Sequence, residues 1–247
     1  MSEKKAALYI KITLWVLTFT VTLPFLWLVK SAISDFLNSR NPIILDWVTN
    51  SLFFTLTALV FTVVSSIMAG FVLSVLDLPF RKTMIVATLI TMLIPTTAMA
   101  MPLYVLVDRI HLNDTVLGLI IASSYYPFGA FLSYLYFTSA MPSDLVGMGR
   151  IDGLGDWGLF LHLGIPLSKA LWSIVTFFSF INLWNSYQLP KVLLSAPEHL
   201  TLPVGMELLY GRGTATIGVL MLIPAIGLYL LSQRSIERGI FSGAVTG

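Results

Sequence analysis

Hydroxyl, amide and aromatic side chains interrupt two of the long apolar runs in this chain. Ser123, Tyr125 and Tyr126 lie midway through one run, and Asn182, Asn185 and Gln188 lie at the end of another. The two asparagines share a face if their segment is helical. Polar groups in apolar segments are costly to bury and are often functional. These six side chains could line a pathway for an uncharged polyol, or they could hydrogen-bond neighbouring helices to each other.

A glycine pattern, Gly153-x-Gly155-x-x-Gly158, matches the spacing of a dinucleotide-binding loop. That function requires a strand before the glycines and an acidic residue about 20 positions later. No strand is predicted before these glycines, and the position about 20 residues after them falls inside an apolar run. The chain also lacks a phosphate-binding loop of the Walker type. We therefore expect no nucleotide cofactor in this chain.

Other kinds of catalytic or metal site are not predicted. His111, His162 and His199 are too far apart in sequence to suggest a ligand set, and the chain has no cysteine. We find no paired carboxylates and no nucleophile with a nearby base in the apolar runs. We therefore predict neither a metal site nor a catalytic residue, and a non-enzymatic role.

The composition indicates a membrane protein. Hydrophobic residues make up 57% of the 247 residues and charged residues 11%, against about 25% charged in soluble domains. The net charge of +2 is small and the basic residues are scattered, which argues against nucleic-acid binding.

Six stretches are long and apolar enough to cross a bilayer as helices, and too long for barrel strands. The N-terminal stretch has no small-residue cleavage site after it, so we interpret it as a membrane helix and not as a signal peptide. We expect a single all-α domain over residues 1–247. The predicted spans are Ile12–Val29, Ser51–Leu76, Thr83–Leu106, Thr115–Phe137, Ala170–Leu189 and Ala215–Ser232.

The distribution of lysine and arginine predicts the orientation. With the N-terminus inside, nine of the 14 basic residues fall on the inner side and five on the outer side. Because inner loops of membrane proteins are enriched in Lys and Arg, both termini are predicted to be cytoplasmic. The loop over 141–169 is then the longest cytoplasmic connection, and the outer loop after Lys191 should be an ordered, turn-rich segment because it is rich in Pro and Gly.

The cytoplasmic loop has the pattern of two short helices separated by glycines. Ser143 or Asp144 could cap the first helix. Gly153 and Gly155 should end it, and Trp157–Gly164 could form the second. Apolar residues at helical spacing predict one stripe on the first helix, made of Leu145, Met148, Ile151 and Leu154.

This loop resembles the EAA loop of ABC importer permeases. The family pattern of a triplet, a glycine and an I-x-L-P end maps onto Gly147-Met148-Gly149, Gly153 and Leu163-Gly164-Ile165-Pro166, with the spacing kept. Arg150-Ile151-Asp152-Gly153 is similar to the core typical of the carbohydrate-uptake branch. Further motifs agree with subunits similar to the smaller maltose-type component: Asn50-Ser51-Leu52, Ile94-Pro95, Trp184-Asn185, Thr201-Leu202-Pro203-Val204-Gly205 and the tail over 233–247.

The resemblance implies a type I importer permease fold in a prokaryotic inner membrane, with six helices and a cytoplasmic coupling helix. It also implies four kinds of partner: a second homologous permease, two ATPase subunits that bind ATP and Mg, an extracytoplasmic solute-binding protein and the lipid bilayer. Docking to the ATPase is expected at nine consecutive or near-consecutive positions: Leu145, Gly147, Met148, Gly149, Arg150, Ile151, Asp152, Gly153 and Leu154.

The chain departs from the family in the triplet, where glycine and methionine replace acidic and small residues. Loss of the glutamate removes one charge contact, and two glycines weaken a helix by roughly 0.5–1 kcal/mol each. Alternatives stay open: a permease for glycerol phosphate, a peptide or another small solute, or a secondary transporter or channel. The absence of ionisable residues inside the later apolar runs favours a neutral sugar or oligosaccharide.

Overall fold

The computed structural model describes residues 3–38, 42–209 and 213–244, with side chains over 8–35, 42–209 and 213–233. Every regular element in these ranges is a helix. In chain order the elements are α1 (Glu3–Asn38), α2 (Ile43–Val75), α3 (Arg81–Leu93), α4 (Thr96–Arg109), α5 (Val116–Ser123), α6 (Pro127–Ala140), α7 (Ser143–Ile151), α8 (Asp156–Leu159), the π-helical turn η1 (Phe160–Gly164), α9 (Ile165–Leu167), α10 (Lys169–Trp184), α11 (Gln188–Leu193), the 3₁₀ turn η2 (Pro197–His199), α12 (Leu202–Leu208) and α13 (Thr214–Ala244).

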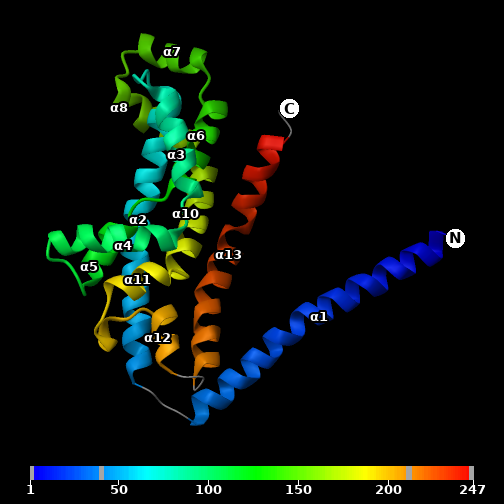
Figure 1. Cartoon of the computed structure of the whole chain (residues 1–247). Coiled ribbons are helices and arrows are strands. Elements are labelled where there is room, and N and C mark those ends of the chain that lie inside the picture. Colours follow the sequence, from blue (N-terminus) through cyan, green and yellow to red (C-terminus); the bar gives the residue numbers. More distant parts are fainter. Residues whose placement is uncertain (1–2, 39–41, 210–212, 245–247) are drawn as a thin grey trace.

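Helix α2 is the central element of the bundle and packs along α6 and α10 (Figure 1). Small residues allow the close approach of α2 and α6. A Cβ added at Gly70 would lie 2.2 Å from Ser133 Cβ, and one added at Gly129 would lie 2.7 Å from Ser66 Oγ. Small residues at such crossings are typical of membrane helices, where close packing replaces the hydrophobic effect as the driving force.

The predicted all-α membrane fold is confirmed. Four helical segments are long and apolar enough to span a membrane: Leu8–Asp35, Ile43–Val75, Val116–Ala140 and Thr214–Gln233. Two bent pairs bring the number to six: α3 with α4, which meet at 105°, and the Asp156–Leu167 segment with α10, which meet at 81°. The first bend is at Ile94 and Pro95, because a proline removes a backbone donor and restricts the residue before it.

Several predicted boundaries need correction. The second helix begins at Ile43, so Asn50 lies about two turns inside it and does not open it. The predicted span Thr115–Phe137 is interrupted between α5 and α6. The predicted fifth span, Ala170–Leu189, ends as a regular helix at Trp184, and a separate helix, α11, follows.

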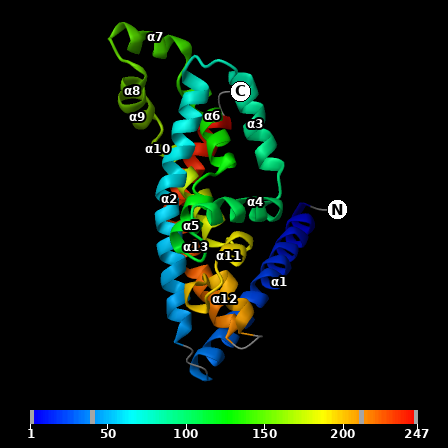
Figure 2. The same ribbon diagram turned by 60° about the vertical axis from the view of Figure 1, so that its left-hand side comes forward.

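The segment with α7 and α8 and the segment with α12 lie at opposite ends of the bundle. Helices α7 and α8 lie at one end, toward which the C-terminal part of α13 runs, and α12 lies at the other (Figures 1 and 2). The outer segment after α11 forms η2 and α12 up to residue 209, as expected for a turn-rich ordered segment, and positions 210–212 of the predicted loop lie outside the described residues.

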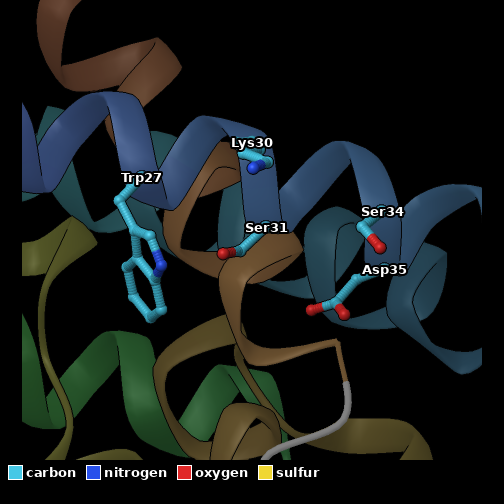
Figure 3. A pocket seen from close by; sticks show the side chains of 5 residues that line it. All are labelled: Trp27, Lys30, Ser31, Ser34 and Asp35. Atoms are coloured by element: carbon cyan, nitrogen blue, oxygen red, sulfur yellow. The ribbon is translucent and has the colours of Figure 1, made fainter.

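Helix α1 diverges from the bundle and packs against α13 (Figure 1). The most apolar 18-residue window of this helix has no buried residue. Thr216 Oγ1 donates to the carbonyl of Ala32 at 3.2 Å, which fixes the outer end of α1 to α13. Beside this contact a shallow hollow of about 280 Å³ is lined by Trp27, Lys30, Ser31, Ser34 and Asp35 (Figure 3).

Candidate functional site

Helix α7 ends in a glycine cap that follows directly from the sequence. Gly153 has φ of 81°, in the region that favours glycine. Its N–H donates to the carbonyl of Arg150 at 3.0 Å, and the N–H of Leu154 donates to the carbonyl of Gly149 at 3.0 Å. This pair of bonds is a Schellman motif, which satisfies carbonyls that the helix end leaves free. The predicted helix end at Gly153 therefore has a clear structural basis.

The start of α7 differs from the prediction. Pro142 is the N-cap residue, and the cap makes no side-chain hydrogen bond, so neither Ser143 nor Asp144 caps the helix. The fixed φ of proline places the chain for helix entry.

Helix α7 packs through Gly149 against the elements that follow it, α8 and η1. Gly149 is buried, and a Cβ added there would lie 2.7 Å from Leu159 Cδ2 and 3.2 Å from Leu163 Cδ1. Leu159 is fully buried and belongs to an apolar cluster with Phe71 and Phe137. Gly149 therefore joins α7 to α2 and α6 through a continuous set of packed side chains.

Aromatic contacts continue this connection. The ring of Phe71, on α2, lies 5.0 Å from that of Phe160 and 5.5 Å from that of Phe137, both edge to face. Phe160 follows α8 directly, and Phe137 is near the end of α6. Edge-to-face rings are favourable in addition to the area they bury. The cytoplasmic loop is thus packed against two membrane helices and is not a loose connector.

The exposed face of the loop combines apolar and charged groups. Ile151 is 87% exposed and Met148 57% exposed. Trp157 and Asp152 are also exposed, and Arg150 forms an ion pair with Asp156. Arg150 donates as well to the carbonyl of Leu154 at 3.2 Å, so its guanidinium is held over the turn between α7 and α8.

The prediction that Leu145, Met148, Ile151 and Leu154 form one apolar stripe is therefore wrong. Met148 and Ile151 face outward, whereas Leu154 is half-buried against the cluster beneath α7 together with Val146, and Leu145 is half-buried outside that cluster. Leu154 lies beyond the helix end and folds back toward Gly149, because the Schellman motif reverses the chain there. Gly147 is exposed with no atom within 4 Å of an added Cβ. Of the nine expected docking positions, Gly149 is the buried one.

At the interruption between α5 and α6, hydroxyls of α2 donate to three backbone carbonyls, of which that of Tyr126 also accepts from the N–H of Ala130 at 3.2 Å. Thr62 Oγ1 donates to the carbonyl of Ser123 at 3.3 Å. Ser65 Oγ donates to the carbonyl of Ser124 at 3.2 Å, and Ser66 Oγ donates to that of Tyr126 at 3.4 Å. Unsatisfied backbone groups are very costly in a bilayer, so these hydroxyls make the break tolerable.

The expected pathway residues lie on two parts of the chain. Ser123, Tyr125 and Tyr126 lie at the break, and Tyr125 is exposed. Asn182 is exposed on α10, and the amide of Asn185, at the end of that helix, donates to its own helix at Ile181. Gln188 begins α11. A row of rings with neighbouring centroids 5.5–6.2 Å apart connects the break to α10 and α13: Tyr126, Phe128, Phe178, Phe177 and Tyr229.

The outer end contains ties that the sequence did not predict. Asp114 accepts from the backbone N–H groups of Ser195 and Ala196 at 2.7 and 3.1 Å. These bonds, above all that from Ser195, hold the pKa of the Asp114 carboxyl below its usual value. On the other side, the indole of Trp47 donates to the carbonyl of Pro197 at 2.7 Å. The sequence indicates only that this loop is rich in turn-forming residues. It does not indicate the bonded partners, because Asp114 and Ser195 are 81 residues apart and Trp47 and Pro197 are 150 residues apart.

A second outer cluster joins Tyr187, Lys191 and Glu207. The four-residue spacing of Tyr187 and Lys191 suggests a helical pair, but nothing in the sequence indicates their partner Glu207 on α12.

A multi-pass helical bundle with broken spans and a packed cytoplasmic helix pair defines a membrane transport permease. The chain belongs to the family described as the binding-protein-dependent transport system inner membrane component, which matches residues 62–242. It is accordingly a multi-pass inner-membrane permease subunit of an ABC importer, as the resemblance implied.

Individual relatives agree. The chain is 30% identical over 218 residues to the arabinooligosaccharides transport system permease protein AraQ of Bacillus subtilis, covering 86% of this chain and 77% of that one. It is 28% identical to the diacetylchitobiose uptake system permease protein NgcG of Streptomyces coelicolor, covering 78% and 67%. A chain of a bacterial ABC transporter that imports the acidic polysaccharide alginate has the same fold, with a TM-score of 0.78, 19% identity, and coverage of 96% and 99%.

Proposed function

We propose that this permease subunit admits an uncharged sugar or oligosaccharide, and that α7 and α8 seat against a separate ATPase subunit. The observation that carries the proposal is the exposed pair Met148 and Ile151, held above a core that reaches α2 and α6. An exposed apolar helix face suits a groove on a partner. Because Gly149 and Leu159 are packed tightly, a push on that face displaces the membrane helices as well.

The assembly that we infer has a second homologous permease, two ATPase subunits and an extracytoplasmic solute-binding protein. ATP and Mg belong to the ATPase subunits, and this chain contributes no catalytic residue. Closure of the ATPase pair would move α7, and the movement would open and close the membrane pathway.

Two facts support a neutral solute. The relatives named above are designated for arabinooligosaccharides and diacetylchitobiose, and a third, MdxG of Bacillus subtilis, for maltodextrin. Within the described residues, the polar side chains that the structure buries are all serine or threonine. A phosphate-bearing solute would call for arginine or lysine.

Purification from the native membrane tests the docking face. Ile151→Asp with Met148→Asp should lose the ATPase subunit, since burial of one such side chain at an interface stabilises by about 1.5–3 kcal/mol. The matched control is Ser139→Asp, which adds a charge at the same end of the molecule on an exposed position of α6. Retention of the ATPase in the double variant would place docking elsewhere, and purification of the unaltered chain without any ATPase subunit would overturn the proposed assembly.

A further inference from the structure

Tyr187, Lys191 and Glu207 form a closed hydrogen-bonded cluster between α11 and α12. Lys191 Nζ donates to Glu207 Oε1 and Oε2 at 2.9 and 2.8 Å, and to the Tyr187 hydroxyl at 2.7 Å. The Tyr187 hydroxyl donates in turn to Glu207 Oε2 at 2.7 Å. The ammonium also lies 5.1 Å from the centre of the tyrosine ring. The cluster therefore fixes both the ring and the carboxylate.

Two members of the cluster face a hollow at the outer end of the bundle. The hollow has a volume of about 600 Å³, in the range of small-molecule sites. Lys191 is not among the residues that line it. The wall comes from α12, α13 and the residue before α11, and consists of Tyr187, Pro203, Met206, Glu207, Thr214 and Met221.

The cluster presents an ionised acceptor without net charge. The hydrogen bond from Lys191, then that from Tyr187, lowers the pKa of the Glu207 carboxyl, and the same contacts raise the pKa of Lys191. A carboxylate has about four acceptor positions, and the cluster fills one on Oε1 and two on Oε2. One position on Oε1 has no donor among the described residues, and we assign it to a donor from outside.

We propose that this hollow is an entry subsite for one ring of a neutral carbohydrate. A sugar hydroxyl would donate to Glu207 Oε1, and the apolar face of the ring would pack against Tyr187 and the methionines. A small ion of either charge would bind only weakly there, because the charges of Lys191 and Glu207 neutralise each other. Lys191 is a positioning residue that keeps the carboxylate ionised and in place. The inference rests on the proposed function and deepens it.

The absence of cysteine from the chain permits a direct test. In the complex purified from the native membrane and placed in liposomes, Met206→Cys is labelled from outside with an impermeant maleimide. Raffinose, maltotriose and arabinotriose serve as probes. The transported sugar should slow labelling several-fold. Ser195→Cys, exposed on the outer loop and outside the hollow, is the matched control and should label at an unchanged rate.

Exchanging the charges of Lys191 and Glu207 distinguishes a sugar-binding role of Glu207 from a purely structural link between α11 and α12. Lys191→Glu combined with Glu207→Lys keeps an ion pair between α11 and α12 but replaces the acceptor in the hollow by an ammonium. We expect the KM for uptake to rise about tenfold with kcat nearly unchanged, as befits loss of a hydrogen bond to a charged group. A KM equal to that of the unaltered chain would overturn the subsite.

The two proposals fail differently. If the unaltered complex transports no neutral sugar or oligosaccharide, the proposed function and the subsite are both overturned. If it transports a sugar that does not protect Met206→Cys, the subsite alone is overturned, and Lys191 and Glu207 then serve as a clasp between two helices.

Discussion

Gly149 of α7 lies against Leu159 of α8 so closely that a Cβ at position 149 would come within 2.7 Å of the leucine Cδ2. This contact joins the cytoplasmic helix to the core beneath it. It also explains why a glycine, which weakens a helix, stands at this position of the loop.

The two glycines of the altered triplet should respond oppositely to substitution. Gly147→Ala adds a methyl in open space and should stabilise α7 by about 0.5–1 kcal/mol through helix propensity. Gly149→Val should destabilise by about 1–3 kcal/mol, because Leu159 is fully buried and has little room to move. Thermal unfolding in detergent measures both changes. Equal transition temperatures for the two variants would contradict the close contact.

The crossing of α2 and α6 should not tolerate a methyl at Gly70. A Cβ there would lie 2.5 Å from backbone atoms of Ser133 and Tyr134, which cannot rotate away as a side chain can. We expect Gly70→Ala to cost about 1–3 kcal/mol and to reduce the amount of protein in the membrane. Gly227→Ala, where nothing lies within 4 Å, is the control. Normal yield and stability of Gly70→Ala would mean that the helices cross farther apart.

The hydroxyls of α2 should matter for the broken span. Thr62→Val keeps the shape of the side chain but removes the donor to the Ser123 carbonyl, at an expected cost of about 0.6–2 kcal/mol. Thr138→Val removes a bond within its own helix, to Tyr134, and should cost less. Chemical unfolding of both variants compares them. A larger loss for Thr138→Val would refute the capping role of α2.

Acid should weaken the tie between Asp114 and the outer loop. The folded-state pKa of Asp114 lies below the ordinary value of 3.8. Its stabilising contribution is therefore complete above that value and is lost as the pH falls through the folded pKa. Asp114→Asn retains an acceptor of the same shape, and asparagine tolerates the positive φ of 54°. The unaltered chain should be slightly more stable than this variant at pH 6, and the difference should shrink in thermal scans as the pH falls below 3.8. A difference independent of pH would exclude the carboxylate charge as its cause.

Local sequence determined those features that depend on residues close together in the chain. Runs such as Ile43–Val75 are too apolar to stay in water and must satisfy their backbone within helices. Gly153 ends α7 where predicted because glycine readily adopts a positive φ, and Pro95 marks a break for an equally local reason. The family motif around Arg150 likewise lies within one short segment.

The tertiary structure decided everything that joins distant segments. Proline predicts a break at position 95 but not the 105° between α3 and α4. Thr62 meets the carbonyl of Ser123, 61 residues away, and Glu207 meets Lys191 across two helices. The same fold turns Met148 outward and Leu154 inward, although helical spacing puts them on one stripe. Hydrophobic periodicity records which residues avoid water, whereas the choice of partner depends on how whole helices pack, and that choice is made only when the chain is folded.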